Sequence, residues 1–341
     1  QTLERNVMKK IYFVPGSQDL YGEECLKQVA ADCRQMVDFL NEKLSDTVQF
    51  CLLPTVETSE ICVEDMKKAV CDDECVGVCT WMHTFSPAKM WIKGLQILNK
   101  PLLHLHTQAN EKLPYETIDM DFMNLNQAAH GDREFGYILA RLDIPHQVVA
   151  GYYKHDDFIA KVRQFAEVAK AIDYSYHMRV ATFGNNMRDV AVTDGNRLSC
   201  EIKYGWEIKY WGIGEIADLA AEVTDAEIAS KMAEYKDKYE MATDRIDVVR
   251  EQARYEVAFE KFLKENKCSA FTDSFQDLHG LNQLPGIAAQ NMMAKGIGFG
   301  PEGDYKIAAF QAVLEKMSEG RKGATGFMED YTYDLTPGEE V

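Results

Sequence analysis

Positive charge is scarce in this sequence. Lys and Arg together number 37 against 55 Asp and Glu, which gives a formal net charge of −18 over 341 residues. Nucleic acids and anionic membrane surfaces attract concentrated clusters of Lys and Arg. The acidic balance therefore predicts that neither of them is the partner of this chain.

Long apolar runs are lacking as well. No window reaches the roughly 18 consecutive apolar residues of a membrane-spanning helix. The first ten residues, QTLERNVMKK, carry charged and polar groups where a signal peptide would have its apolar core. We therefore expect a cytoplasmic protein.

The nine cysteines lie mostly in apolar runs and are interpreted as buried free thiols. A metal cluster of Cys71, Cys75 and Cys79 is the alternative.

Short local motifs of catalysis are also missing. The sequence has no His-Glu-x-x-His, no Gly-x-Ser-x-Gly elbow and no phosphate-binding glycine loop of the Walker or dinucleotide type. Local motifs alone therefore leave the reaction undecided.

The chain does carry an alternating strand and helix pattern. Short β-branched runs predict strands at residues 11–14, 48–53, 75–80, 102–105 and 148–149. Between the first two, apolar residues recur at helical spacing and predict a crossover helix, namely at Leu26, Val29, Cys33, Met36, Val37, Leu40 and Leu44. Strand, helix and strand in this order predict a parallel sheet. Ser86 and Pro87 predict a helix start, with Ser86 as N-cap.

A second segment of the same kind starts at residues 179–183, with helical patterns around 226–239 and 255–263. The alternating residues 327–333 predict a strand that enters a further domain. We therefore predict an α/β protein with two consecutive doubly wound domains, each with a mainly parallel sheet, over residues 1–173 and 174–318. Residues 319–341 would begin a truncated C-terminal domain.

Three segments hold carboxylates or histidines in predicted loops or strands. Glu302 lies between glycines before a helix pattern, where a turn with an N-cap is the structural alternative. Glu329 lies on a predicted strand, where edge exposure is the alternative. Residues 124–134 are dense in hydrogen-bonding groups, for which helix capping is the alternative. The other histidines, including His104 and His106, are interpreted as structural.

Longer motifs resemble the bacterial L-arabinose isomerase family, in the same order and over essentially the whole chain. They are residues 14–22, 81–91, 124–135, 183–188, 275–281, 303–306 and 327–333. The resemblance implies two Rossmann-like domains before a C-terminal domain. It also implies one Mn²⁺ per active site, bound by two glutamates and two histidines. The glutamates match Glu302 and Glu329.

The resemblance also implies the sugar contacts and the assembly. Gln18, Leu20, Tyr21, Met187 and Phe275 would surround the sugar. Gln127 and His130 would reach the pocket of a neighbouring subunit in a hexamer. The implied reaction interconverts L-arabinose and L-ribulose, as in arabinose catabolism. The metal acidifies the proton on C2 and a carboxylate moves this proton through an enediol, with Glu302 and Glu329 as the two candidates.

One departure from the family is that the last histidine, His279, precedes Glu329, so two histidine ligands are absent. The chain is then a fragment or a degenerate homologue. The preserved motifs favour an inactive fragment. Two other functions stay open: a non-catalytic sugar-binding or scaffolding protein, and a fucose-type isomerase that acts on another sugar.

Overall fold

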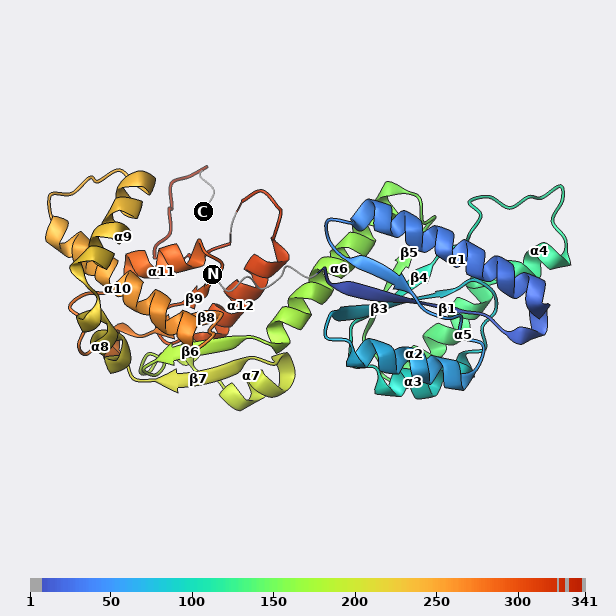
Figure 1. Ribbon diagram of the computed structural model, residues 1–341, viewed down its shortest axis with the longest axis horizontal. Coiled ribbons are helices and arrows are strands. Elements are labelled where there is room, and N and C mark those ends of the chain that lie inside the picture. Colours follow the sequence, from blue (N-terminus) through green and yellow to red (C-terminus); the bar gives the residue numbers. More distant parts are fainter. Residues whose placement is uncertain (1–7, 324, 329–330, 339–341) are drawn as a thin grey trace. The chain divides into compact units, whose positions relative to one another are not determined.

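The chain divides into two compact units, Gln1–Lys170 and Ala171–Val341. A computed structural model describes residues 8–323, 325–328 and 331–338. Each unit is an α/β layer structure with strands inside and helices outside (Figure 1). The division falls inside helix α6 (Asp156–Tyr176), and the domain boundary predicted at residue 173 lies in the same helix.

The first unit contains a sheet of five parallel strands in the order β2-β1-β3-β4-β5. All five predicted strands are confirmed. Their bounds are β1 (Lys10–Gly16), β2 (Gln49–Leu52), β3 (Cys75–Met82), β4 (Leu102–His106) and β5 (His146–Ala150). The strand order reverses between β1 and β3. In such sheets ligands bind outside the carboxyl ends of the strands at the reversal.

Helices cover both faces of this sheet. They are α1 (Gly22–Leu44), α2 (Ser59–Cys71), α3 (Ile92–Ile97), α4 (Met120–Leu125), α5 (Ala128–Arg141) and α6. The predicted crossover helix is α1, and six of its seven predicted apolar positions are buried. It packs with α6 against one face, while α2, α3 and α5 pack against the other (Figure 1). The predicted doubly wound arrangement is therefore confirmed for this unit.

The second unit contains four parallel strands in the order β7-β6-β8-β9. These are β6 (Arg179–Phe183), β7 (Glu207–Trp211), β8 (Ala270–Asp273) and β9 (Gly298–Gly300). Its helices are α7 (Arg197–Tyr204), α8 (Gly214–Glu222), α9 (Asp225–Lys238), α10 (Ile246–Glu265), α11 (Gly286–Met293) and α12 (Tyr305–Met317). The helices predicted at 226–239 and 255–263 are α9 and part of α10.

Helix α12 lies unusually close to strand β9. A Cβ atom added to Gly298 would come within 2.1 Å of the Ala308 carbonyl oxygen, so the strand needs glycine at this position. The apolar face of α12 packs with β6 and β8, while α8 to α11 form the larger core on the opposite side. Helices on both faces confirm the second predicted α/β sheet.

Two local predictions are wrong. Ser86 is not a helix cap: its hydroxyl accepts a hydrogen bond from Trp91 Nε1 at 3.0 Å. The following turn, Ala88–Trp91, is a 3₁₀ helix, and the Glu134 carboxylate accepts the bond from the Ala88 N–H. Tertiary contacts therefore replace the local cap.

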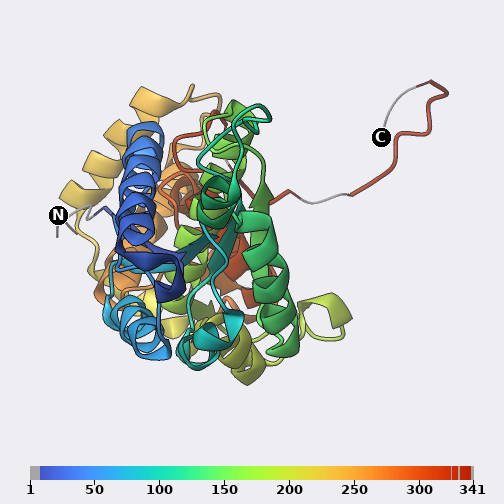
Figure 2. The same ribbon diagram turned by 90° about the vertical axis from the view of Figure 1, so that its right-hand side faces the viewer.

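The strand predicted at 327–333 is absent from the described residues 327–328 and 331–333, which form neither strand nor helix (Figure 2). Met328, Tyr331 and Tyr333 are 91%, 88% and 76% exposed. Alternation of apolar residues predicts a strand only where a neighbouring strand pairs with it. The described residues of this segment belong to neither of the two sheets.

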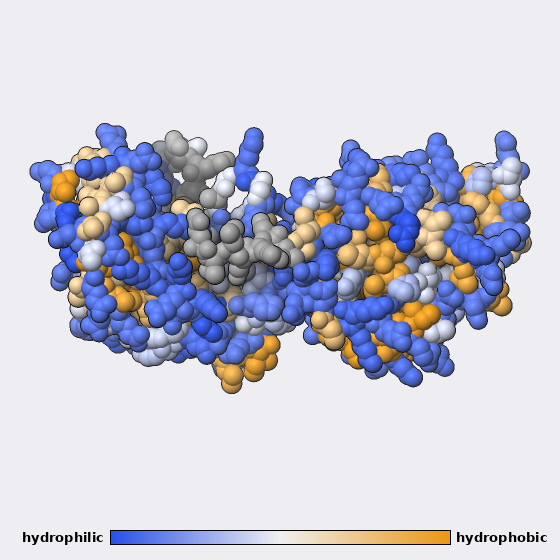
Figure 3. Space-filling model, in the orientation of Figure 1, coloured by the Kyte–Doolittle hydropathy of each residue, from blue (hydrophilic) through white to orange (hydrophobic). Residues whose placement is uncertain are grey.

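An apolar patch covers α7 on the surface of the second unit (Figure 3). Leu198 and Ile202, both on this helix, are 67% and 72% exposed. Exposed apolar patches are typical of association surfaces. None of the helices in the described residues is both long enough and apolar enough to span a bilayer.

Candidate active site

The carboxyl ends of β6, β8 and β9 bring three predicted site residues to one edge of the second sheet. Met187 follows β6, Phe275 follows β8 and Glu302 follows β9. The Met187 N–H donates a hydrogen bond to the Glu302 carbonyl oxygen at 2.8 Å. Next to it, the Gly303 N–H donates to the Asp273 carbonyl oxygen at the same distance. Backbone hydrogen bonds therefore tie the three loops together.

Glu302 is held by its backbone rather than by its side chain. Its φ angle of 63° lies in the left-handed region, which is uncommon for a residue with a side chain. The neighbouring Gly303 also has positive φ, and a Cβ there would come within 2.4 Å of the Asn185 carbonyl oxygen. The half-buried Glu302 carboxylate makes no hydrogen bond or ion pair with any described residue. The fold therefore fixes the main chain of Glu302 and leaves its carboxylate available to a ligand.

The loop after β6 is anchored by the 3₁₀ turn Phe275–Asp277. The Asn185 N–H donates to Asp277 Oδ2 at 3.3 Å, and the Arg188 N–H donates to Gln276 Oε1 at 2.8 Å. An ion pair of 3.2 Å also joins Arg188 to Asp277. These bonds use the polar side chains of the turn and leave the Phe275 ring half exposed. Phe275 can therefore form the apolar wall of a ligand site.

Asp273 is a carboxylate at this edge that we did not predict. It ends β8, is 5% exposed, and has one carboxylate oxygen without a hydrogen-bond partner among the described residues. Burial raises the pKa of Asp273 to about 7. The sequence feature that could have indicated it is an acidic residue at the end of a short apolar run, Ala270–Asp273.

The first unit holds the other predicted sugar contacts. Tyr21 Oη lies 3.5 Å from Gln127 Oε1, so the loop after β1 meets the start of α5. Gln127 Nε2 in turn donates to Asn124 Oδ1 at 3.1 Å. Gln18, three residues before Tyr21, is half-buried. Leu20, in the same turn, is 79% exposed.

His130 lies one turn further along α5, where it packs against Phe85 with ring centroids 4.8 Å apart. The two rings border an open hollow of about 680 Å³, whose other lining residues are Ala129, Arg133, Glu134 and Tyr137. Both His130 and Tyr137 are exposed. This face of α5 is therefore accessible to a ligand or to another chain.

Glu329 lies outside the described residues, so its role stays a prediction. Gln18, Leu20, Tyr21, Gln127 and His130 belong to the first unit, while Met187, Phe275 and Glu302 belong to the second.

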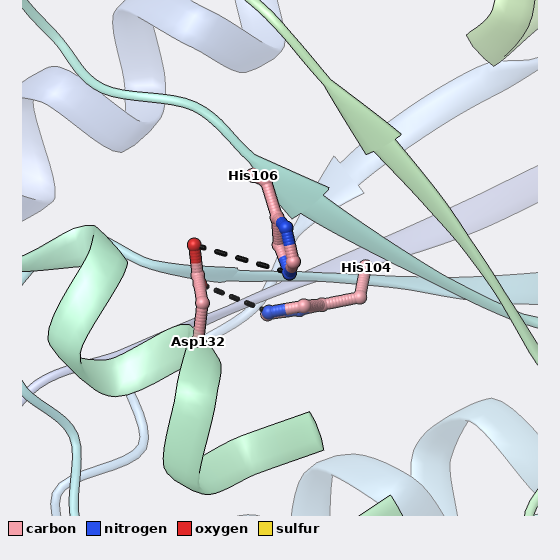
Figure 4. Close-up of side chains that lie close together, drawn as sticks. All are labelled: His104, His106 and Asp132. Carbon is pink, nitrogen blue, oxygen red and sulfur yellow. Dashed lines mark hydrogen bonds and ion pairs between the residues drawn. The ribbon is translucent and has the colours of Figure 1, made fainter.

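A histidine–aspartate cluster at the end of β4 was missed by sequence reasoning. His104 Nε2 lies 2.9 Å from Asp132 Oδ1, and His106 Nε2 lies 4.0 Å from Asp132 Oδ2 (Figure 4). Thr80 Oγ1 contacts the other ring nitrogen of His104 at 2.8 Å. Burial raises the pKa of Asp132 to about 7 and lowers the pKa of His104 to about 3. Burial also lowers the pKa of His106.

Comparison with known proteins supplies the family. The profile of the L-arabinose isomerase N-terminal domain matches residues 5–177, and that of the L-arabinose isomerase central domain matches residues 179–320. The chain belongs to the L-arabinose isomerase family. The two matched domains meet between residues 177 and 179, next to the end of α6.

Curated relatives agree with this assignment. The L-arabinose isomerase of Thermotoga petrophila is 47% identical over 334 residues, which cover 97% of this chain and 67% of that protein. L-arabinose isomerase 2 of Bacillus licheniformis is 48% identical over 338 residues, or 97% of this chain and 71% of the relative. The chain therefore spans about two thirds of the length of these relatives.

A solved structure, an ABC sugar transporter (periplasmic sugar binding protein) from Legionella pneumophila, aligns over 92% of this chain and 96% of its own. Its TM-score is 0.21 and its sequence identity is 12%.

The structure contains two groups of residues of the types that bind metal ions, one in each unit. Glu302 and Asp273 offer carboxylate oxygens at the edge of the second sheet. His104, His106 and Asp132 offer imidazole nitrogens and a carboxylate in the first unit. The pair of histidines two apart on a strand was the signal for the second group, since such residues point to the same face.

Proposed function

We propose that this chain carries the sugar-binding residues and part of the metal site of an L-arabinose isomerase, which interconverts L-arabinose and L-ribulose. The observation that supports it best is the Glu302 carboxylate, which the backbone contact with Met187 holds at the ends of three parallel strands without a side-chain partner among the described residues. Family membership supports the reaction type.

The residue types at this edge fit a hard divalent cation. Carboxylate oxygens suit Mn²⁺, and Glu302 is half-buried with no protein cation beside it in the described residues. Glu302 and Glu329 would hold one Mn²⁺ per active site, with histidine ligands outside this chain. The bound ion would polarise O1 and O2 of the open-chain sugar and acidify the proton on C2.

The chain's own residues would divide the remaining work. One of the two glutamates takes the proton from C2 and returns it to C1, while the hydroxyl proton moves from O2 to O1; both glutamates are candidates for this step. Met187 and Phe275 would face the sugar carbons as an apolar wall. Gln18, Tyr21 and Gln127 can donate hydrogen bonds to sugar hydroxyls, and the exposed Leu20 would add to the apolar wall.

We further propose a hexamer in which Gln127 and His130 enter the pocket of a neighbouring subunit. The exposed face of α5 and the apolar patch on α7 support association. Nine free cysteines support a reducing, cytoplasmic location.

Substrate profiling tests the proposal. The protein that contains this chain is assayed with Mn²⁺ for ketose formation from L-arabinose, L-fucose and D-arabinose. We expect L-arabinose to be the preferred sugar. Sugar binding without turnover of any of the three would favour the non-catalytic alternative instead.

A further inference from the structure

We propose that His104, His106 and Asp132 form a second metal site, which binds a divalent transition ion of the Zn²⁺ type. One ligand atom of each residue lies within 4.8 Å of the others. The two histidines come from β4 and the aspartate from α5, so the site would join a strand to a helix (Figure 4).

The distances lie close to those of a tetrahedral site. Zinc binds imidazole nitrogen and carboxylate oxygen at about 2.0–2.2 Å, which places neighbouring ligand atoms roughly 3.4 Å apart. His104 Nε2 lies 2.9 Å from Asp132 Oδ1, and His106 Nε2 lies 4.0 Å from the other oxygen, Oδ2, so each imidazole faces one carboxylate oxygen at a separation near this value. The two imidazole rings meet edge to face, with centroids 5.0 Å apart. The ligand atoms all lie within 4.8 Å of one another, so small side-chain rotations would bring them to these separations.

The burial of the Asp132 carboxylate also favours a bound cation. Its side chain is 6% exposed, and its ion-pair partners within the described residues are the two histidines alone. A buried carboxylate is stabilised by a paired charge or by a metal ion. Arg133 lines the adjacent hollow and forms no ion pair with Asp132 in the described part of the chain.

A hydrogen bond with Thr80 orients the His104 ring for metal binding. Thr80 Oγ1 lies 2.8 Å from His104 Nδ1 and donates to the Leu103 carbonyl oxygen at 3.3 Å. The same hydroxyl oxygen can therefore accept a hydrogen bond from Nδ1–H, which leaves the lone pair of Nε2 free for a cation. Metal-binding histidines are commonly oriented by such a bond to their second nitrogen.

The site has an open side. The His106 side chain is 39% exposed and borders a hollow of about 390 Å³, together with Thr107, Gln108, Ala128, Ala129, Asp132 and Arg133. Thr107 is 5% exposed, yet its hydroxyl oxygen has no hydrogen-bond partner in the described residues. Within the described part of the chain, the Thr107 hydroxyl is therefore an unpaired polar group beside the same hollow. The hollow also gives the ion a route from solvent.

Ligand type separates this site from the one at Glu302. Two imidazoles and one carboxylate favour Zn²⁺, Co²⁺ or Ni²⁺, whereas carboxylate-rich sites suit Mn²⁺ and Mg²⁺. The proposal does not depend on isomerase activity. An ion here would hold Asp132 near the start of α5, two residues after His130 and five after Gln127.

Metal titration of the 341-residue chain tests the proposal. Chelator-treated protein is titrated calorimetrically with Zn²⁺, and its visible spectrum is recorded with Co²⁺. We expect one Zn²⁺ per chain and the intense absorption of four-coordinate Co²⁺. His106→Gln and Asp132→Asn should weaken Zn²⁺ binding by more than the roughly 10–100-fold expected for the second-sphere variant Thr80→Val.

Two controls keep the test specific. His155→Gln removes a histidine that pairs with Glu111 at 3.0 Å but has no third ligand in the described residues, so it should leave binding unchanged. Glu302→Gln should also leave it unchanged. Zn²⁺ should raise the melting temperature of the parent chain but not of the partly exposed His106→Gln variant. Absence of Zn²⁺ binding, or equal binding by folded His106→Gln and the parent, would show a purely hydrogen-bonded cluster and overturn the proposal.

Discussion

Met187 and Glu302 are joined by a backbone hydrogen bond of 2.8 Å, although they lie 115 positions apart in the sequence. The bond links the loop after β6 to the turn after β9. It leaves the carboxylate of Glu302 uncommitted to any described side chain. A residue fixed through its main chain can change its side-chain chemistry without disturbing the fold.

In an isomerase with the complete ligand set, Glu302→Gln is therefore expected to lower isomerisation strongly and to leave stability unchanged. The substitution removes a metal charge and a candidate proton carrier, which should lower kcat by about 10²–10⁴-fold. Ketose formation from L-arabinose and the midpoint of urea unfolding are measured together. Glu222→Gln, at the exposed end of α8, is the matched control and should remain active. Near-normal turnover of Glu302→Gln would remove it from the mechanism.

Mixed oligomers test whether the active site is shared between subunits. His130→Ala and Glu302→Gln proteins should each be inactive alone. After subunit exchange in equal amounts, about one quarter of the sites should hold both native residues if they come from different subunits. Gln127→Ala should behave like His130→Ala. Failure of both mixtures to regain activity, with exchange verified by mass spectrometry, contradicts the shared site.

The 341-residue chain alone is expected to bind Mn²⁺ weakly at Glu302 and to form no measurable L-ribulose. Hard divalent ions need several converging donors, and the sequence contains no histidine after His279. Calorimetry with Mn²⁺ and a ketose assay check the two halves of the claim. Tight binding with robust turnover would mean that other residues of the chain complete the ligand set.

Asp65 should make the first unit less stable as the pH rises. Its side chain is 1% exposed, and burial raises its pKa from 3.8 to about 6, against a weaker opposing effect of Lys68. The folded state then binds the proton more tightly than the unfolded state, so stability is lost between about pH 4 and pH 6. The loss is at most about 3 kcal/mol.

Asp65→Asn removes this titration. Urea unfolding of the parent and the variant at pH 4.5 and pH 7 gives the difference between their pH slopes, with the exposed Asp38→Asn as a control. Parallel slopes for Asp65→Asn and the parent would show that Asp65 keeps an ordinary pKa. The comparison uses slopes because the asparagine amide adds its own constant cost in the core.

Local pattern alone determined most of the secondary structure. Apolar residues at 3.6-residue spacing in α1 and β-branched runs in β1 to β5 each satisfy burial within one element, so neighbouring residues carry the information. The acidic composition also follows from the sequence alone. Long motifs in register predicted the family and indicated Glu302 as a ligand residue.

Tertiary structure decided the features that depend on partners distant in sequence. Ser86 bonds to Trp91 instead of capping a helix, because Glu134 from α5 takes over that role. The alternating residues near Tyr331 form no strand in the described part, because no sheet edge pairs with them. His104 meets Asp132 only because α5 packs beside β4, so two histidines interpreted as structural lie in a ligand-type cluster. Hydrogen bonds and ion pairs act over a few ångströms in space, and spacing along the chain cannot reveal which distant segments the fold brings within that reach.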